Sequence, residues 1–468
     1  MRMNPNLKLT LYSLFLFLLI AAAAAPLDNF FVFVVSTCVV GMLIIKSYLG
    51  KWLLFSIPSL PSMFLISFIA LIVLPSIYIY ICESDSARYA YLVAFISPLV
   101  TFPFGVLLAS LLQVSKADPR AFITSALNPS ALDMRLMPVV ILLLLLSMPY
   151  LYVYYSIVPF VQLFEIMKPG GSNVDPLQFR YANRNAPFIV VGLFELFRRI
   201  ILPLCTVYIH GVSRIYGGGY RPLFVCVFLY SLFFAALTLD RAPIFAMVIV
   251  LMFSKLLLDG FKTFDLIKPK IIVLIAAAIL VGGVVTGLQK WSSSFSAEQL
   301  KAYVIGFLSS RVFLNPSEIS WTNYRQWYHS YEFLGGKSIR LLAPLMGLEY
   351  EPLGPASFIA DLWRNFAWPG IILGPIVLGA FLQILQQSFF PRKTIFRTML
   401  FIILGLNSAW LIYGNALGTV PIFVFLSCMC LHYFMAHADT EDRSSKPSQT
   451  TGYASRPFLT ASRPKGSA

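Results

Sequence analysis

Residues 289–366 read QKWSSSFSAEQLKAYVIGFLSSRVFLNPSEISWTNYRQWYHSYEFLGGKSIRLLAPLMGLEYEPLGPASFIADLWRNF, the longest polar stretch of a chain that is otherwise dominated by apolar runs. This segment is rich in Arg, Trp, Tyr and carboxylates, and the sequence before it consists of apolar runs with short connections. Apolar runs of this kind form membrane-embedded helices, so the polar segment is expected to lie outside the hydrocarbon. We therefore expect the chemistry of the protein at the membrane surface, in residues 289–366.

The composition indicates an integral membrane protein. Of 468 residues, 58% are hydrophobic and 12% are charged, whereas soluble domains carry about 25% charged residues. A transmembrane helix needs about 20 mostly apolar residues. Stretches that meet this requirement lie at about 9–25, 29–49, 61–82, 88–113, 136–159, 187–209, 221–238, 241–258, 270–288, 369–387, 396–413 and 416–435. The sequence therefore predicts an all-α polytopic protein with about 12 transmembrane helices.

Lys and Arg concentrate in alternate connections, which orients the helices because cytoplasmic loops carry an excess of these residues. With the N-terminus inside, the inner connections hold most of the cations. The connections at 83–87, 160–186, 239–240 and 289–366 are then outside and carry most of the acids. Both termini are predicted to be cytoplasmic. The net charge of +15 follows from this asymmetry, so anionic membrane lipids are an expected partner and nucleic acid is not.

The chain reads as one transmembrane domain, residues 1–438, followed by a cytoplasmic tail. The tail, 439–468, is rich in Ser, Thr and Pro and is expected to be disordered. Within the large outer loop, 297–308 and 318–332 have helical spacing, and Asn315-Pro316-Ser317 is a plausible helix start. The interleaved Trp and Tyr residues place these short amphipathic helices in the headgroup layer.

Arg241 is the first candidate for chemistry, in the sequence Asp240-Arg241-Ala242-Pro243 at the start of an apolar stretch. Pro243 suits the first turn of a helix. An Arg at that position lies at the positive end of the helix dipole, so a further anion must favour it. An anionic ligand would favour it; the alternatives are a local ion pair with Asp240 or a role of Arg241 as an interfacial anchor.

Further arginines lie in the predicted outer connections, where the excess of Lys and Arg on cytoplasmic loops does not explain them. A guanidinium binds phosphate oxygens through two parallel hydrogen bonds, which suits these residues to an anionic ligand. The alternative is a set of solvated loop cations. Arg311 is, like Arg241, a candidate for the catalytic group. The candidates for substrate binding are Arg180 and Arg184, which are four residues apart, with Arg325 and Arg340.

Three residues of the large loop are candidates for proton transfer: Glu318, His329 and Glu332. An unperturbed His titrates near neutrality, which suits a general base, although a lone His among aromatic residues is more often structural. The sequence shows no metal-ligand cluster and no Gly-rich nucleotide loop with Lys, so no cofactor is expected.

Glu195, Arg198 and Arg199 form a charged group mid-way through the apolar stretch 187–209. Spacings of three and four residues allow the carboxylate to pair with an arginine on one helix face. Charges inside a membrane are costly and are functional candidates by default; the alternative is an internal ion pair that fixes helix packing.

Three stretches resemble the Wzy-type polymerases of O-antigen and exopolysaccharide repeat units. TLDRAPIFAMVIV (238–250) is similar to the family's Arg-containing helix start, with Leu239-Asp240 in place of the usual Gly-Thr or Gly-Ser. SRVFLNPSEISW (310–321) resembles the family's Arg-rich loop segment, and 329–379 resembles the run that follows it into the next helix. The similarity covers about residues 180–385, and it implies a GT-C-like membrane fold in the bacterial inner membrane.

The resemblance implies a glycosyltransferase that joins undecaprenyl-diphosphate-linked oligosaccharides at the periplasmic face, with a chain-length regulator protein as a further partner. It places Arg241 and Arg311 at the diphosphate, assisted by Arg180 and Arg184, with Glu318, Glu332 or His329 as the base. An O-antigen ligase or another lipid-linked GT-C glycosyltransferase is the nearest alternative. A polysaccharide flippase or transporter is the alternative from another class, although transporters place polar residues at the bilayer midplane.

Overall fold

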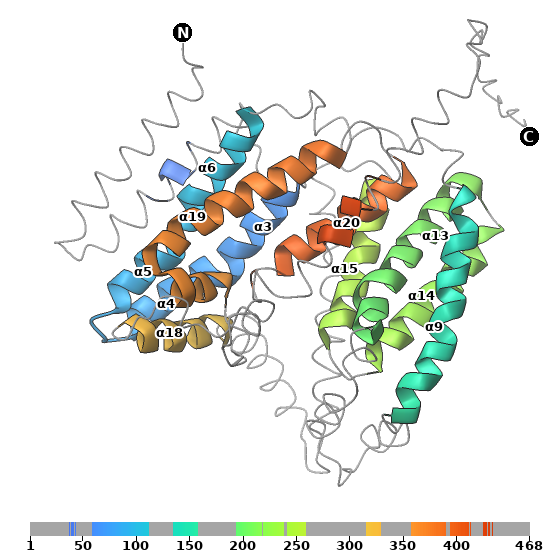
Figure 1. The fold of residues 1–468 in the computed structure, drawn as a ribbon, viewed down its shortest axis with the longest axis horizontal. Helices are drawn as coiled ribbons and strands as arrows, with labels where there is room; N and C mark the ends of the chain where they lie inside the picture. The colour runs from blue at the N-terminus through green and yellow to red at the C-terminus, as the bar shows by residue number, and fades with distance from the viewer. Residues whose placement is uncertain are drawn as a thin grey trace, which may run out of the picture.

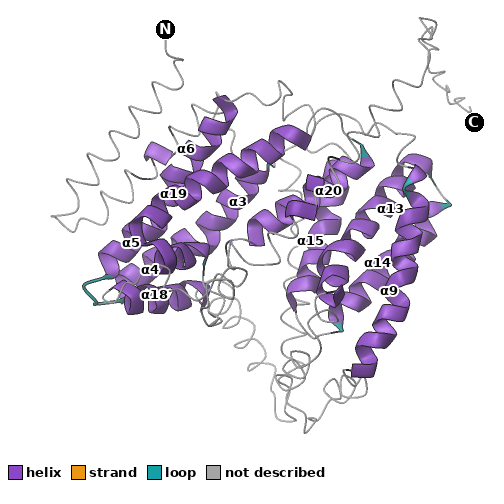
Figure 2. Ribbon diagram, in the orientation of Figure 1, coloured by secondary structure: helices purple, strands orange, loops and turns teal. Residues whose placement is uncertain are grey.

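The computed structural model describes residues 59–111, 134–157, 193–217, 219–237, 241–258, 315–328, 357–389 and 394–410, together with a few separate positions between 37 and 433. These residues are 93% helical and include no strand, as Figure 2 shows. The all-α prediction is therefore confirmed for the described part of the chain.

One group of helices is built around two long apolar hairpin arms (Figure 1). The first arm is continuous through α3 (Leu60–Phe68), the π-helical segment η3 (Ile69–Val73) and α4 (Leu74–Cys82). After a short turn at 83–87 the chain returns through α5 (Arg88–Ile96) and α6 (Pro98–Leu111). From the C-terminal half of the chain, α19 (Phe358–Phe389) packs on α6 and α3, and α18 (Asn315–Tyr328) packs on α4, η3, α5 and α19.

The second group contains α9 (Met137–Ile157), the π-helical segment η4 (Phe197–Ile201), α13 (Leu202–Tyr216), α14 (Tyr220–Ala236) and α15 (Arg241–Leu258). A tight turn joins α13 to α14, where Gly217 adopts φ 86°, a conformation that glycine tolerates without steric cost. The last helix, α20 (Ile395–Trp410), contacts α13 and α15 as well as α3, so it joins the two groups.

Three described helices are long and apolar enough to cross a membrane, by length and composition: Leu60–Cys82, Arg88–Leu111 and Phe358–Gln387. Shorter apolar helices include α14, α15 and α20, and they coincide within a few residues with the predicted stretches 221–238, 241–258 and 396–413. These helices support the prediction that the protein is a membrane protein. The number of about 12 spans stays a prediction, because several of the expected stretches lie outside the described residues.

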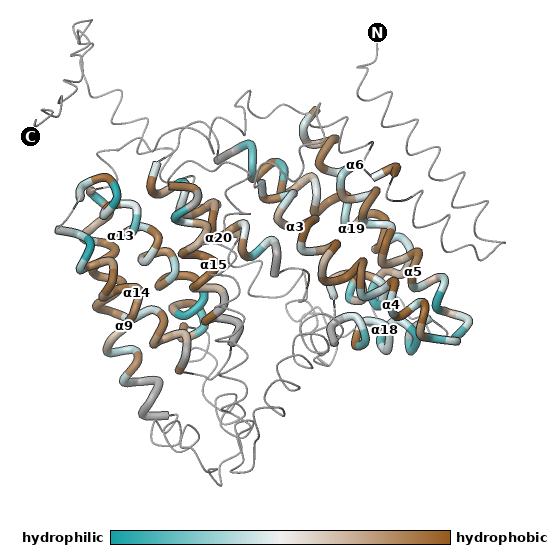
Figure 3. The backbone as a smooth tube through the Cα atoms, turned by 180° about the vertical axis from the view of Figure 1, so that it is seen from behind, coloured by the Kyte–Doolittle hydropathy of each residue, from teal (hydrophilic) through white to brown (hydrophobic). Residues whose placement is uncertain are grey.

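The described charges gather at opposite ends of the helices. Arg214 ends α13, Arg221 begins α14, Lys255 lies in the last turn of α15 and Arg397 lies in the first turn of α20. These helix ends lie at one end of the fold, and the 83–87 turn, α18 and the start of α15 lie at the other (Figure 1). Figure 3 shows hydrophilic residues at both ends and apolar helices between them. This separation agrees with the predicted alternation of charge. We refer to the end that carries α18 as the α18 end.

A sharp kink divides α19 at Ala367, whose φ of 49° and ψ of −139° are not helical. The segment 358–366 is folded back on the helix that follows, and a side chain at Gly370 or Gly374 would collide with Leu362. Residues 358–366 are therefore helical, a short helix at the end of the polar segment 289–366 in addition to the spacings recognised at 297–308 and 318–332. A hydrophobicity scan does not detect this short helix, because residues 358–366 include polar side chains.

Glycines allow α6 and α19 to make the most extensive helix–helix contact of the described residues. A Cβ at Gly105 would overlap the backbone of Ile376, and a Cβ at Gly379 would overlap the carbonyl of Phe102. Small residues that let helix backbones approach closely are the usual basis of packing inside membranes, where apolar burial gives little driving force. The position of α19 therefore depends on these two glycines.

We predict that Gly105→Ala and Gly379→Ala each destabilise the protein by about 1–3 kcal/mol, because backbone atoms cannot move away from an added methyl group as a side chain can. The measurement is thermal unfolding of the purified protein in detergent. Gly219→Ala is the matched control, since a Cβ at that position meets nothing within 4 Å. Equal melting temperatures for all three variants would show that the close contact is not required.

Candidate functional site

The helix α18 presents one buried face and one exposed face. Ser317, Ser320, Trp321 and Tyr324 are buried, and their spacing of three or four residues defines a single stripe. Glu318 and the other exposed positions lie outside this stripe. The predicted start at Asn315-Pro316-Ser317 is confirmed, because the helix begins at Asn315.

A proline explains how the start of α18 is attached to the first arm. Pro75 has no N–H, so the carbonyl of Leu71, four residues earlier, has no helical hydrogen-bond donor. The helix is π-helical at this point, in the segment η3. The Ser317 hydroxyl donates to the Leu71 carbonyl at 3.4 Å. The Tyr91 hydroxyl donates to the carbonyl of Ser317 at 3.2 Å. Two helices that are distant in sequence thus hold the first turn of α18.

A pair of serines attaches the middle of α18 to the start of α19. The buried Ser320 hydroxyl donates to the Ser357 hydroxyl at 3.0 Å and accepts from the Ser357 N–H at 2.9 Å. The Ser357 hydroxyl in turn accepts from the Ala360 N–H at 3.3 Å, which caps the first turn of α19. Asp361 in the same turn lies at the positive end of the helix dipole, where a carboxylate is favourable.

Aromatic rings fill the space between α18 and its neighbours. Tyr91 contacts Trp321 edge-on with the ring centroids 5.1 Å apart, and Tyr324 lies 4.5 Å from Trp363. Burial raises the pKa of the Tyr324 hydroxyl well above its usual range, so this group stays neutral and is not the proton acceptor of a reaction at neutral pH. Tyr328 and Trp368 are the partly exposed members of the group.

The structure describes three of the nine residues that the sequence proposes for the site. Glu318 is exposed on α18. Arg325 is exposed on the last turn of α18, with a guanidinium nitrogen 4.0 Å from the Asp85 carboxylate of the 83–87 turn. Arg241 is the first residue of α15, and only its backbone is described. The other six, Arg180, Arg184, Arg311, His329, Glu332 and Arg340, lie outside the described residues, so their roles stay predictions.

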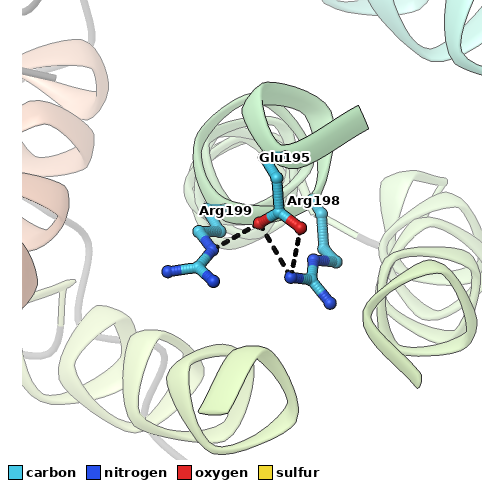
Figure 4. A network of polar contacts seen from close by, with 3 residues as sticks. All are labelled: Glu195, Arg198 and Arg199. Atoms are coloured by element: carbon cyan, nitrogen blue, oxygen red, sulfur yellow. Dashed lines mark hydrogen bonds and ion pairs between the residues drawn. The ribbon is translucent and has the colours of Figure 1, made fainter. Parts of the chain in front are cut away.

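Glu195, Arg198 and Arg199 form the one charged network that Figure 4 draws, and we call it the Glu195 triad. Arg198 donates from Nη2 to both carboxylate oxygens, at 2.5 Å and 2.7 Å. Arg199 donates from Nε to Oε2 at 2.6 Å. The predicted pairing is confirmed, and the carboxylate binds both arginines rather than one. Arg198 also lies 5.7 Å from the centre of the Phe194 ring, in a cation–π contact.

The triad lies close to the C-terminal end of α14. Phe194 stacks on Phe234 with the ring centroids 4.9 Å apart, and Phe234 is two residues before the end of α14. The segment η4 also contacts α15, which begins at Arg241 on that side. The helix of this stretch extends to Tyr216, seven residues past the predicted end, while residues 187–192 lie outside the described residues, so the depth of the triad stays a prediction.

The sequence left the triad outside the proposed site, although the signal was present. Two arginines and one glutamate in an apolar stretch are unusual, because charges inside a membrane are costly and are often functional. Among the described residues no group of three His, Cys, Asp or Glu side chains is arranged to hold a metal ion. The described chemistry of the α18 end therefore consists of guanidinium groups, exposed carboxylates and aromatic rings.

We predict that Ser320→Ala loosens α18, because it leaves the buried Ser357 N–H without its acceptor, at a cost of about 1–3 kcal/mol. Faster hydrogen exchange in residues 315–328 than in the unchanged protein is the expected result. Thr322→Ala is the control, since the Thr322 hydroxyl is on the exposed face and bonds only within the helix, to the Glu318 carbonyl. If residues 315–328 exchange at the same rate in Ser320→Ala and Thr322→Ala, the serine pair does not hold α18 in place.

Comparison with known proteins adds no relative: no family model, no curated protein and no solved structure matches this chain.

Proposed function

We propose that this protein polymerises undecaprenyl-diphosphate-linked oligosaccharide repeat units at the outer face of a bacterial inner membrane. The observation that supports this most directly is the packing of the polar segment on the apolar helices. There α18 and residues 358–366, both from that segment, pack on each other through the Ser320–Ser357 pair and the Tyr324–Trp363 rings. The sequence resemblance to Wzy-type polymerases supports the same activity.

The proposed reaction needs no nucleotide. A hydroxyl of the acceptor repeat attacks the anomeric carbon of the donor chain, a new glycosidic bond forms, and the bond from that carbon to the diphosphate oxygen breaks. Undecaprenyl diphosphate leaves, and a base takes the hydroxyl proton. Glu318 is the described candidate for that base, because it is an exposed carboxylate on α18; Glu332 and His329 are the others.

Arg241 and Arg311 are proposed to stabilise the charge that develops on the leaving diphosphate. The start of α15 favours an anion there, since unpaired N–H groups and the helix dipole both point toward it. Arg325 is a weaker candidate for substrate binding, because Asp85 already lies beside its guanidinium. An exposed ion pair of this kind is worth only about 0–1 kcal/mol, so a phosphate would compete for Arg325 readily.

We predict that Arg241→Ala and Arg311→Ala each reduce polymer formation by about 10²–10³-fold, while single lipid-linked repeats accumulate. Arg→Lys restores only part of the activity, because an ammonium group cannot make the paired hydrogen bonds. The measurement is polysaccharide chain length on gels together with mass spectrometry of the lipid-linked pool. The control is Arg221→Ala, which removes an exposed cation at the opposite end of the fold.

The same measurement separates the other functions. A ligase would leave long lipid-linked chains that are not transferred to their acceptor. A flippase would leave single repeats that an added periplasmic probe cannot reach. Chains of normal length in both Arg→Ala variants would contradict the proposed polymerase site.

A further inference from the structure

Two aromatic side chains at the α18 end are exposed although they belong to a packed group of rings. Tyr328, the last residue of α18, is 39% exposed, and Trp368, directly after the kink in α19, is 38% exposed. The buried Trp363 contacts both: its ring stacks on that of Tyr328 with the centroids 6.2 Å apart and meets the Trp368 ring edge-on at 5.4 Å. One buried indole therefore orients two exposed rings, and we call these residues the three-ring cluster.

The backbone beside Trp368 has a conformation that costs free energy. Ala367 has a φ of 49° and a ψ of −139°, a combination that residues with a Cβ rarely adopt. Strained residues of this kind persist only where the surrounding structure fixes them, and they cluster at active sites and ligand-binding sites. Here the strain sets the direction in which the chain enters the part of α19 that begins with Trp368.

A second cost lies within the same group of rings. The Nε1–H of Trp363 is buried and, within the described part of the chain, donates no hydrogen bond. The same is true of the hydroxyl of Tyr324, whose ring lies 4.5 Å from that of Trp363. Buried polar groups without a hydrogen bond are rare, and each one lowers stability. Departures from optimal stability that gather in one place are expected at a functional site.

Polar side chains border the three-ring cluster on α18. Arg325 lies one turn before Tyr328, on the same face of the helix. The Arg325 side chain is 53% exposed, and its guanidinium lies 4.0 Å from the carboxylate of Asp85. This surface therefore combines exposed aromatic rings with a group that donates hydrogen bonds and a group that accepts them.

A sugar ring is the ligand that matches this combination. One face of a pyranose ring presents C–H groups and is apolar, and hydroxyl groups project from its edge. The C–H groups pack on the face of an aromatic ring, which is electrostatically negative. The hydroxyl groups bind guanidinium and carboxylate groups. A lipid chain would use the rings but not the charged pair, and a free phosphate would use Arg325 but not the rings.

We propose that Tyr328 and Trp368 stack on sugar rings of the lipid-linked oligosaccharide and hold the repeat unit against α18. This proposal rests on the proposed function and extends it from the diphosphate to the oligosaccharide. Trp363 positions the two exposed rings and does not contact the sugar, because it is buried. The ring of Tyr328, and not its hydroxyl group, supplies the contact.

Aromatic residues at a membrane surface also anchor proteins in the headgroup layer, and the two roles have different consequences. If Tyr328 and Trp368 only anchor the protein, their replacement affects the binding of every ligand equally or not at all. If they stack on sugar, their replacement weakens the binding of a ligand that carries sugar and leaves the binding of the same lipid without sugar unchanged.

The experiment compares two ligands of the full-length protein in nanodiscs of zwitterionic lipid. The first ligand is the lipid-linked repeat unit purified from cells that lack this protein, and the second is undecaprenyl diphosphate, which carries no sugar. The unchanged protein is expected to bind the repeat unit more tightly. Trp368→Leu and Tyr328→Leu each weaken the binding of the repeat unit roughly three- to tenfold, the range of a single aromatic contact, and leave the affinity for undecaprenyl diphosphate unchanged.

Matched variants isolate the effect of the ring. Trp368→Phe and Tyr328→Phe keep an aromatic ring and are expected to retain most of the affinity for the repeat unit, whereas Leu keeps only an apolar side chain. Tyr152→Leu is the control for the loss of an exposed ring elsewhere, because Tyr152 on α9 is 79% exposed and belongs to the other group of helices. This variant is expected to bind both ligands as the unchanged protein does.

The outcomes separate this inference from the proposed function. An unchanged protein that binds neither ligand contradicts both. If both ligands bind and neither Leu variant weakens the binding of the repeat unit, the inference alone is overturned. Equal losses for the repeat unit and for undecaprenyl diphosphate identify a structural role and also overturn it. If Trp368→Leu does not fold, Tyr328 decides: a loss with Leu that Phe restores supports the inference, and a loss with both or with neither rejects it.

Discussion

The close approach of α6 and α19 is the contact on which the arrangement of the α18 end depends. Gly105 and Gly379 bring two backbones together that any side chain would separate. Because α19 is fixed in this way, the kink at Ala367 and the folded-back segment 358–366 have a defined position. Ser357 directly precedes that segment and holds α18 through Ser320. A packing contact between apolar helices thus determines where a polar helix lies.

Much of the helical framework could be predicted from the sequence, because long apolar stretches are unambiguous. The helices α14 and α15 were located to within a few residues for this reason. The start of α18 could also be predicted, from the proline and serine that begin it. The segment 358–366 could not, since its helix contains charged and amide side chains that are buried against other helices rather than against lipid. Hydrophobicity alone does not distinguish such a helix from a loop.

The candidate site was predicted less completely, and the reason is again physical. The pairing within the Glu195 triad follows from spacing on one helix, so it was predictable. Its nearness to the start of α15 depends on how η4, α14 and α15 pack, which no spacing rule reports. The same limit applies to Leu71. The proline at position 75 predicts that the Leu71 carbonyl lacks its usual helical donor. The sequence does not predict that the hydroxyl of Ser317, from a distant part of the chain, donates to that carbonyl.

The attachment of α18 has a consequence for how the protein is made. Ser317 bonds to Leu71 and Tyr91, which are synthesised more than two hundred residues earlier. At about 5–20 residues per second, ribosomes reach α18 on the order of ten seconds or more after the first hairpin has entered the membrane. In the folded protein the Tyr91 hydroxyl also lies 3.3 Å from the Ser76 hydroxyl, within the first hairpin itself. Folding of the α18 end therefore waits for synthesis of the large polar segment, and a chain that ends before Asn315 would lack the helix that packs on the first hairpin.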